Sequence, residues 1–194
     1  PICLHYRSNN ETLRDGDLLL IDAGGEYGYY TADITRTFPV GKGFTDAQSE
    51  LYDLVLKAQK AAIAISRPGT LWPMIHKTAT DVLIDGLLSM GLLQGKADEI
   101  FKSGAFRRYY PHGTGHWLGM DVHDIGLYQV SYGANVPEPR KLGPGMVFTI
   151  EPGFYIQPND EEAPGEYRGI GIRIEDDILI TSTGCEVMTA GAPK

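Results

Sequence analysis

The stretch Leu18–Phe38, LLLIDAGGEYGYYTADITRTF, decides the fold. Apolar residues at its start give way to turn-forming glycines, and Thr, Ile and Phe return near its end, which predicts two antiparallel strands. A turn centred between Tyr27 and Gly28 would place Asp22 directly opposite Asp33. Because like charges facing each other on a sheet are destabilising, that arrangement requires a cation between the carboxylates. A turn elsewhere would leave the two Asp at strand ends in solvent, and the hairpin alone does not decide between these interpretations.

The composition is that of one ordinary domain. The chain has 194 residues, 42% of them hydrophobic, and 17 Lys and Arg stand against 25 Asp and Glu, a net charge of -8. The acidic balance makes nucleic acid and anionic membrane unfavourable partners. No apolar run reaches the roughly 20 residues of a membrane span, and no signal peptide opens the chain. The two distant cysteines, Cys3 and Cys185, suit a reducing compartment, so we expect a cytoplasmic protein.

Two long helices and a short one are predicted after the hairpin. Thr45 and Gln48 form a capping-box pattern ahead of apolar residues at helical spacing, which end at Arg67. A second helix is predicted from about Pro73 to Met90, and a shorter one over Ala97–Ser103.

The chain contains one internal repeat. LRDGDLLLIDAGGEY (Leu13–Tyr27) aligns without a gap with LGPGMVFTIEPGFYI (Leu142–Ile156). Each copy has a Gly-containing turn, an apolar stretch, and then Ile, an acid, one residue and Gly, so that Asp22 aligns with Glu151. Buried strands can share apolar residues by chance, but an acid and a Gly in register are less expected. We therefore predict two related halves, each supplying one strand-end carboxylate to a shared site.

The segment GIGIRIEDDILI (Gly169–Ile180) predicts one further strand. Its alternation places Arg173 and Glu175 on one face and isoleucines on the other. Charged side chains in so apolar a run need polar partners. Either the shared site or an internal pair between the arginine and the acid would supply them.

The stretch HGTGHWLGMDVHD (His112–Asp124) holds three of the five histidines of the chain. His112 and His116 have the spacing of a zincin pair, but Gly113 stands where the catalytic Glu would be, and three glycines argue against a helix. Three histidines in one glycine-rich stretch indicate a function. The isolated His76 in the second helix could be a ligand, but a lone His on a helix is more typical of a surface or capping residue.

The combined inventory is two Asp, two Glu and at least one His, all near strand ends. Oxygen-rich sites with one imidazole suit Mn²⁺, Co²⁺ or Zn²⁺. Four carboxylates are too many for one ion but suit two bridged ions, which is the arrangement of hydrolytic dinuclear sites.

These stretches resemble the pita-bread metallopeptidases, and among them the Xaa-Pro aminopeptidases, also called aminopeptidases P. The matching text is IDAG through TADITRTF, HGTGHWLGMDVHD, PGMVFTIEPGFYI and YRGIGIRIEDDILIT, which together span nearly the whole chain. The resemblance implies an α+β pita-bread fold, a curved antiparallel sheet with pseudo-twofold halves flanked by helices. It also accounts for the internal repeat.

The resemblance implies that two divalent ions, most often Mn²⁺, are held by five residues. These metal ligands would be Asp22, Asp33, His116, Glu151 and Glu175. By the family pattern, Asp33 and Glu175 bridge the ions. Glu151 is also the expected proton shuttle, taking a proton from the metal-bound water and passing it to the leaving proline nitrogen.

Five further residues would act on the substrate. By the same resemblance His5, His112 and His123 bind the scissile carbonyl and the product side and steady the tetrahedral intermediate. Tyr155 and Arg173 are expected as substrate contacts or as partners of the ligands. The implied substrates are peptides with proline at position two, and a homo-oligomeric full-length protein is compatible with the family.

The chain also departs from this family. Members carry an N-terminal domain and an opening strand and helix before the CLHY segment, so we expect residues 1–194 to form one catalytic domain that is incomplete at its N-terminus. Some members have Ser at the position of Gly115, a change that we expect to leave ligation unaffected. The alternatives are prolidase, which cleaves Xaa-Pro dipeptides, and an inactive pita-bread binding module.

Overall fold

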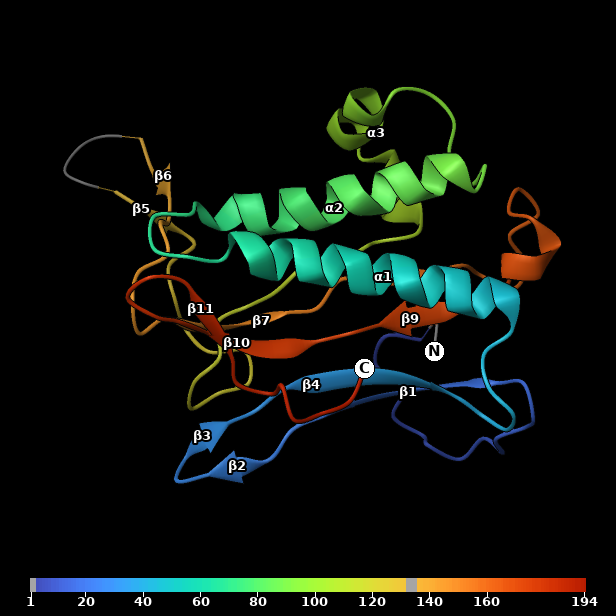
Figure 1. The fold of residues 1–194 in the computed structure, drawn as a ribbon, viewed down its shortest axis with the longest axis horizontal. Coiled ribbons are helices and arrows are strands. Elements are labelled where there is room, and N and C mark those ends of the chain that lie inside the picture. The colour runs from blue at the N-terminus through green and yellow to red at the C-terminus, as the bar shows by residue number, and fades with distance from the viewer. Residues whose placement is uncertain (1–2, 132–135) are drawn as a thin grey trace.

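Two long helices lie side by side across one face of a curved antiparallel sheet (Figure 1). The computed structural model describes residues 3–131 and 136–194. The helices are α1 (Asp46–Ile65), α2 (Trp72–Ser89) and α3 (Ala97–Ser103), with 3-10 turns η1 (Ala105–Arg108) and η2 (Gly165–Tyr167). The main strands are β1 (Leu18–Ala23), β4 (Ile34–Pro39), β7 (Val147–Ile150), β8 (Gly153–Tyr155), β9 (Gly171–Arg173), β10 (Asp176–Ile180) and β11 (Cys185–Val187). Two short hairpins complete the described elements: β2 (Glu26–Tyr27) with β3 (Tyr30–Thr31), and β5 (Gln129–Val130) with β6 (Glu138–Pro139).

The predicted hairpin forms, but its register differs from the expected one. β1 pairs antiparallel with β4 so that Asp22 lies opposite Thr35, and the prediction that Asp22 faces Asp33 directly was wrong. The turn is centred one residue later, on Gly28 and Tyr29, which both have positive φ values (59° and 72°). That is the backbone pattern of a type I′ turn, whose twist matches the twist of the strands. Asp33 therefore lies diagonally from Asp22 on the hairpin.

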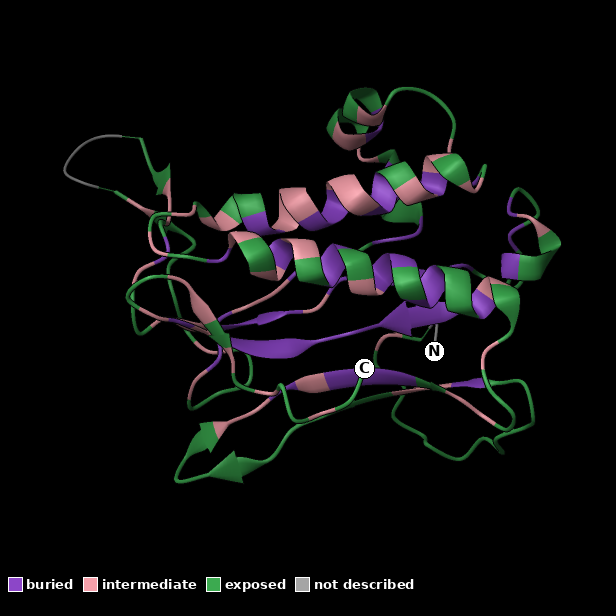
Figure 2. Ribbon diagram, viewed as in Figure 1, coloured by how far each residue is buried: buried purple, intermediate pink, exposed green. Residues whose placement is uncertain are grey.

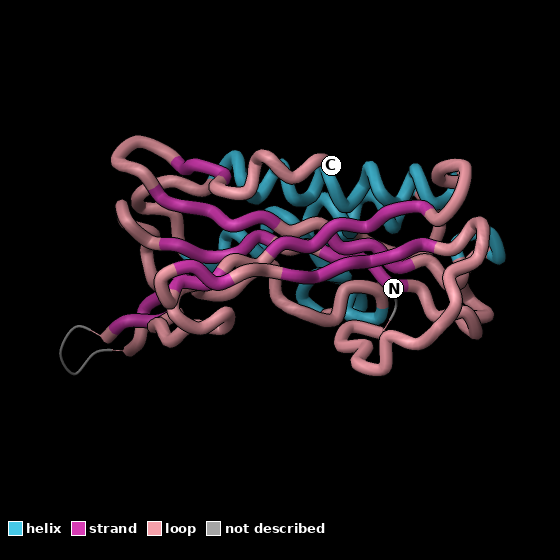
Figure 3. The backbone as a smooth tube through the Cα atoms, turned by 90° about the horizontal axis from the view of Figure 1, so that it is seen from below, coloured by secondary structure: helices cyan, strands magenta, loops and turns pink. Residues whose placement is uncertain are grey.

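The second half of the sheet repeats this arrangement. β7 begins at Val147, the position that the internal repeat aligns with Leu18 at the start of β1. β7 pairs antiparallel with β10, and β8 with β9, so the strands run side by side in the curved sheet (Figure 3). The single strand expected over Gly169–Ile180 is divided into β9 and β10, because the backbone leaves the ladder at Ile174 and Glu175.

The helices form where the sequence predicts them. Thr45 and Gln48 make both hydrogen bonds of a capping box at the start of α1. α1 packs closely on α2, since a Cβ built on Gly86 would lie 2.4 Å from the methyl carbons of Leu54. The inner faces of both helices and the sheet strands beneath them are buried (Figure 2). Among the described residues, no helix is both long enough and apolar enough to cross a membrane.

Candidate metal centre

The four predicted acidic ligands lie at strand ends on the sheet face that points away from the helices. Asp22 is near the end of β1, Asp33 directly precedes β4, Glu151 directly follows β7, and Glu175 lies between β9 and β10. Ile172 and Ile174 belong to the hydrophobic core, so the alternation of the chain turns Glu175 to the other face. The sheet thus brings together acids that are far apart in sequence.

His116 lies among these acids. Its Nε2 atom is 3.4 Å from Asp33 Oδ2 and 3.6 Å from Glu151 Oε1. Asp33, His116 and Glu175 each offer a ligand atom, and these atoms all lie within 4.8 Å of one another. The Nδ1–H group of His116 donates to the Trp117 carbonyl oxygen (3.0 Å), which leaves Nε2 for the acids. The Asp22 carboxyl belongs to the same group, since burial and the neighbouring Asp33 both raise its pKa.

The two glutamates of this cluster hold protons that free acids would lose. Burial and the neighbouring carboxylates raise the pKa of Glu151 to about 7, although His116 opposes the shift. Burial and the Glu151 and Asp33 charges raise the pKa of Glu175 to about 9. Burial is the largest effect on Asp33 and acts to raise its pKa, but the interactions with His116 and Asp22 together outweigh burial and leave that pKa lowered. The cluster therefore has an excess of negative charge that cations would compensate, and the donor set of oxygens with one imidazole fits two divalent ions.

Beside the cluster, His112, Tyr155 and Arg173 form one hydrogen-bonded chain. Burial lowers the pKa of His112 to about 4, so the ring is neutral near pH 7. Its Nδ1–H donates to the Gly113 carbonyl (2.7 Å), which makes Nε2 the acceptor from the Tyr155 hydroxyl (2.8 Å). The same hydroxyl oxygen accepts from Arg173 Nη1 (3.0 Å).

Arg173 also joins this chain to the acids. Its Nη2 atom lies 2.6 Å from Asp22 Oδ2. Arg173 therefore forms an ion pair with Asp22 of β1, and not the internal pair with Glu175 that the sequence allowed.

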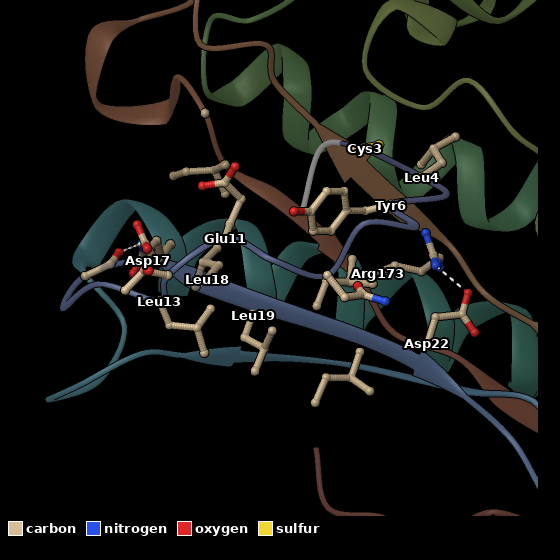
Figure 4. Close-up of a pocket in the computed structure, with 18 of the residues that line it drawn as sticks. Cys3, Leu4, Tyr6, Glu11, Leu13, Asp17, Leu18, Leu19, Asp22 and Arg173 are labelled. Atoms are coloured by element: carbon tan, nitrogen blue, oxygen red, sulfur yellow. Dashed lines mark hydrogen bonds and ion pairs between the residues drawn. The ribbon is translucent and has the colours of Figure 1, made fainter.

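His123 and His5 lie further out. The exposed His123 packs its ring edge-to-face on His116, with ring centroids 4.2 Å apart. The exposed His5 lines a cavity of about 1220 Å³ between the N-terminal segment and β1, and Asp22 and Arg173 line the same cavity. Figure 4 shows the Asp22–Arg173 ion pair at one end of this cavity.

The glycine-rich loop contains no helix, as expected, and it packs tightly on β7. A Cβ built on Gly115 would lie 1.9 Å from the Thr149 carbonyl oxygen. A side chain at Gly115 would therefore require β7 or the residue beside His116 to move. The expectation that such a change leaves ligation unaffected stays a prediction.

Two residues of the site were not found in the sequence. Thr35 donates from Oγ1 to Glu175 Oε2 (2.6 Å), and its spacing of two from Asp33 on one strand is a signal that could have identified it. His76 is half-buried and its Nδ1 lies 2.9 Å from Thr114 Oγ1, while the Thr114 carbonyl accepts from the Glu151 amide (2.7 Å). The surface or capping role expected for His76 was wrong, because its half-buried ring contacts Thr114. No local sequence pattern links α2 to this loop.

The fold and the cluster define a class of protein: a pita-bread domain of the kind found in metallopeptidases. The model of metallopeptidase family M24 matches residues 2–182, and the chain belongs to that family.

Similar proteins are also found among curated sequences. A Xaa-Pro aminopeptidase of Escherichia coli is 50% identical over 98% of this chain and 42% of its own length. Xaa-Pro aminopeptidase 3 of Homo sapiens is 42% identical over 98% of this chain and 36% of its own length. The chain thus spans about two fifths of the length of the curated relatives it matches.

Solved structures show the same fold. Aminopeptidase PepP of Pseudomonas aeruginosa superposes with a TM-score of 0.95 at 48% identity, covering 100% of this chain and 42% of that one. A variant of Escherichia coli aminopeptidase P in complex with substrate superposes with a TM-score of 0.91 at 49% identity, over 100% of this chain and 42% of that one.

Proposed function

We propose that residues 1–194 form a catalytic domain that releases the N-terminal residue from peptides with proline at position two, using two divalent metal ions. The observation that carries this proposal is the cluster of Asp22, Asp33, His116, Glu151 and Glu175 on one face of the sheet. The names of the Xaa-Pro aminopeptidase relatives support the substrate class. A cytoplasmic location and a homo-oligomeric full-length protein remain predictions from the sequence.

The five clustered residues would hold the ions, with Asp33 and Glu175 as bridges and Mn²⁺ as the expected metal. When bound, the ions would make a water molecule more acidic and polarise the scissile carbonyl group. Thr35 supports this arrangement, because its hydroxyl fixes one Glu175 oxygen and leaves the other to a cation.

Glu151 is suited to move the proton. Its two carboxylate oxygens lie 3.6 Å from His116 Nε2 and 3.8 Å from His112 Nδ1, between the ligand cluster and the substrate-side histidine. In the proposed reaction Glu151 takes a proton from the attacking water and delivers it to the leaving proline nitrogen.

The substrate-side residues would bind the scissile carbonyl and the product. Neutral His112 is held in place by the Tyr155 hydroxyl, which Arg173 holds in turn. To donate to a substrate carbonyl, His112 would exchange one of its two present hydrogen bonds for that contact. Alanine variants of Escherichia coli aminopeptidase P have been solved at histidine and aspartate positions. The intervals between those positions along the chain are the same as the intervals between His5, Asp22, Asp33, His112, His116 and His123.

Selection for proline has a physical rationale. The bond before proline is a tertiary amide without an N–H group, so proteases that need that donor cannot bind it. A site that holds the carbonyl through metal ions and histidines does not depend on the missing donor.

The test is cleavage of an Ala-Pro-Ala tripeptide and an Ala-Pro dipeptide by the chelator-treated chain after refilling with Mn²⁺. Release of Ala from the tripeptide that depends on Mn²⁺ is the expected result. Cleavage of the dipeptide alone would contradict the proposal in favour of prolidase. Absence of both cleavage and bound Mn²⁺ would contradict it in favour of an inactive binding module.

A further inference from the structure

We propose that Arg36 is a positioning residue that fixes the distance between the two strands carrying the predicted bridging ligands Asp33 and Glu175. Arg36 contacts neither of these two ligand side chains. Its own side chain lies on the face of the sheet opposite to the one that carries them. The contacts of Arg36 are present without any ion, so its effect on the two strands does not depend on the proposed function. Only its expected effect on metal binding and catalysis rests on that proposal.

The guanidinium group of Arg36 bridges β4 and the residues before β10. Nη1 donates to the carbonyl oxygens of Thr35 (2.9 Å) and Glu175 (2.5 Å). Nη2 donates to Asp176 Oδ1 (2.8 Å). One planar, rigid guanidinium group, called the Arg36 fork below, therefore contacts the backbone of both Thr35 and Glu175. A lysine ammonium group cannot reproduce this geometry.

Asp176 is fixed in turn by three more donors. Its side chain has no solvent exposure, and it accepts from Gln59 of α1 (2.8 Å), from Thr189 (2.8 Å) and from Lys194 (2.5 Å). One donor comes from α1 and two come from the C-terminal segment after β11, so Asp176 joins the Arg36 guanidinium group to both parts of the chain. A buried ion pair by itself adds little net stability, which points to a geometric role for this one.

The C-terminal segment closes the arrangement. Arg36 Nε donates to the Pro193 carbonyl (2.9 Å) and Nη2 to the Ala192 carbonyl (3.0 Å). In Figure 1 the end of the chain lies beside β4, in agreement with these contacts. All the donor groups of the fork are thus directed at fixed acceptors.

The neighbours of Arg36 and Asp176 transmit this arrangement to the cluster. The side chains of Thr35 and Glu175 point to the other face of the sheet, where the Thr35 hydroxyl donates to Glu175 Oε2 (2.6 Å). Their backbones are also joined, because the Glu175 amide donates to the Thr35 carbonyl (3.1 Å). On β10, Asp177 Oδ2 accepts from the Asp33 amide (3.2 Å). Loss of the fork would therefore loosen both bridging ligands while leaving every ligand side chain present.

The experiment compares the whole chain with Arg36→Met, Arg36→Lys and the control Arg108→Met. Arg108 also pairs with two carboxylates, Asp160 and Glu162, but it contacts none of the predicted ligands. The first measurement is hydrogen exchange of the Glu175 amide in metal-free protein. The second is the Kd for Mn²⁺ by titration, followed by kcat and KM for Ala-Pro-Ala.

In Arg36→Met we expect Glu175 exchange to be at least about tenfold faster and Mn²⁺ binding about 10- to 100-fold weaker, as for other residues that orient metal ligands. We expect kcat to fall more than KM rises, since the substrate contacts remain. Arg36→Lys should recover only part of each loss, and Arg108→Met none of these changes.

Two results would overturn the inference. One is an Arg36→Met variant with wild-type Glu175 exchange, and the other is an Arg36→Lys variant that matches wild type in both measurements. If Arg36→Met does not fold, Arg36→Lys decides alone. If the wild-type chain binds no Mn²⁺, the proposed function fails separately, and the exchange rate of the Glu175 amide still decides whether Arg36 holds the strands.

Discussion

At the residue scale, Glu151 combines two roles in one carboxylate, since its two oxygens approach different histidines. We expect Glu151→Gln, which keeps the size of the side chain, to lower kcat for Ala-Pro-Ala by at least about 10²-fold, the lower end of what a general base contributes. The measurement is steady-state cleavage with saturating Mn²⁺. Glu161→Gln changes an exposed acid in the same half of the chain and should leave kcat unchanged. Near-native turnover by Glu151→Gln would contradict the proposed role.

The residues of the cluster were predictable because each is marked by its own local sequence. Asp22 and Glu151 end apolar stretches that the repeat aligns, and His116 lies in an unusual run of glycines and histidines. Arg36 and Asp176 carry no such mark. Their contact joins segments that are distant in the chain, and only the tertiary pairing of strands, which alternation cannot predict, brings them together.

At the element scale, the loop that carries His116 depends on its close approach to β7. A Cβ on Gly115 would meet the Thr149 carbonyl at 1.9 Å, whereas a Cβ on Gly113 has nothing nearer than 3.9 Å. We therefore expect Gly115→Ala to destabilise the chain by about 1–3 kcal/mol through overpacking and to weaken Mn²⁺ binding. Gly113→Ala is the matched control in the same loop.

Urea unfolding midpoints and Mn²⁺ titrations of the two alanine variants test this prediction. Equal stability and equal Mn²⁺ affinity of Gly115→Ala and Gly113→Ala would show that the loop can retreat from β7 without cost.

Helices were easier to predict than strand pairing for a physical reason. The capping box of α1 and the apolar periodicity of α2 are local, so their bounds agree with the sequence to within a residue or two. The hairpin register depends on which residues take positive φ, and Tyr29 does so where a smaller residue is usual. The break between β9 and β10 follows the contact of Glu175 with β4, a tertiary effect.

At the scale of the whole molecule, the two halves of the sheet bring like charges together, so stability should depend on pH when no metal is bound. The pKa of Glu175 is raised to about 9 from an ordinary value of 4.5, so the folded form keeps a proton that the unfolded chain releases. Stability therefore falls as pH rises toward 9. His112, with its pKa lowered to about 4, has finished titrating in both forms above about pH 7.5 and adds no slope there.

Removing and restoring the metal tests this prediction directly. In chelator-treated protein we expect the urea midpoint to fall steadily between about pH 7.5 and 9. In Glu175→Gln, which keeps the size of the side chain but cannot ionise, this fall should be reduced. Mn²⁺ at about 100 times its Kd should stabilise the wild-type fold by about 2.7 kcal/mol, because it binds only the folded form. It should stabilise Glu175→Gln less, since a bridging ligand is missing. A metal-free protein that becomes more stable over this pH range would contradict the argument, because the acids would then have to be compensated by groups of the protein and not by cations.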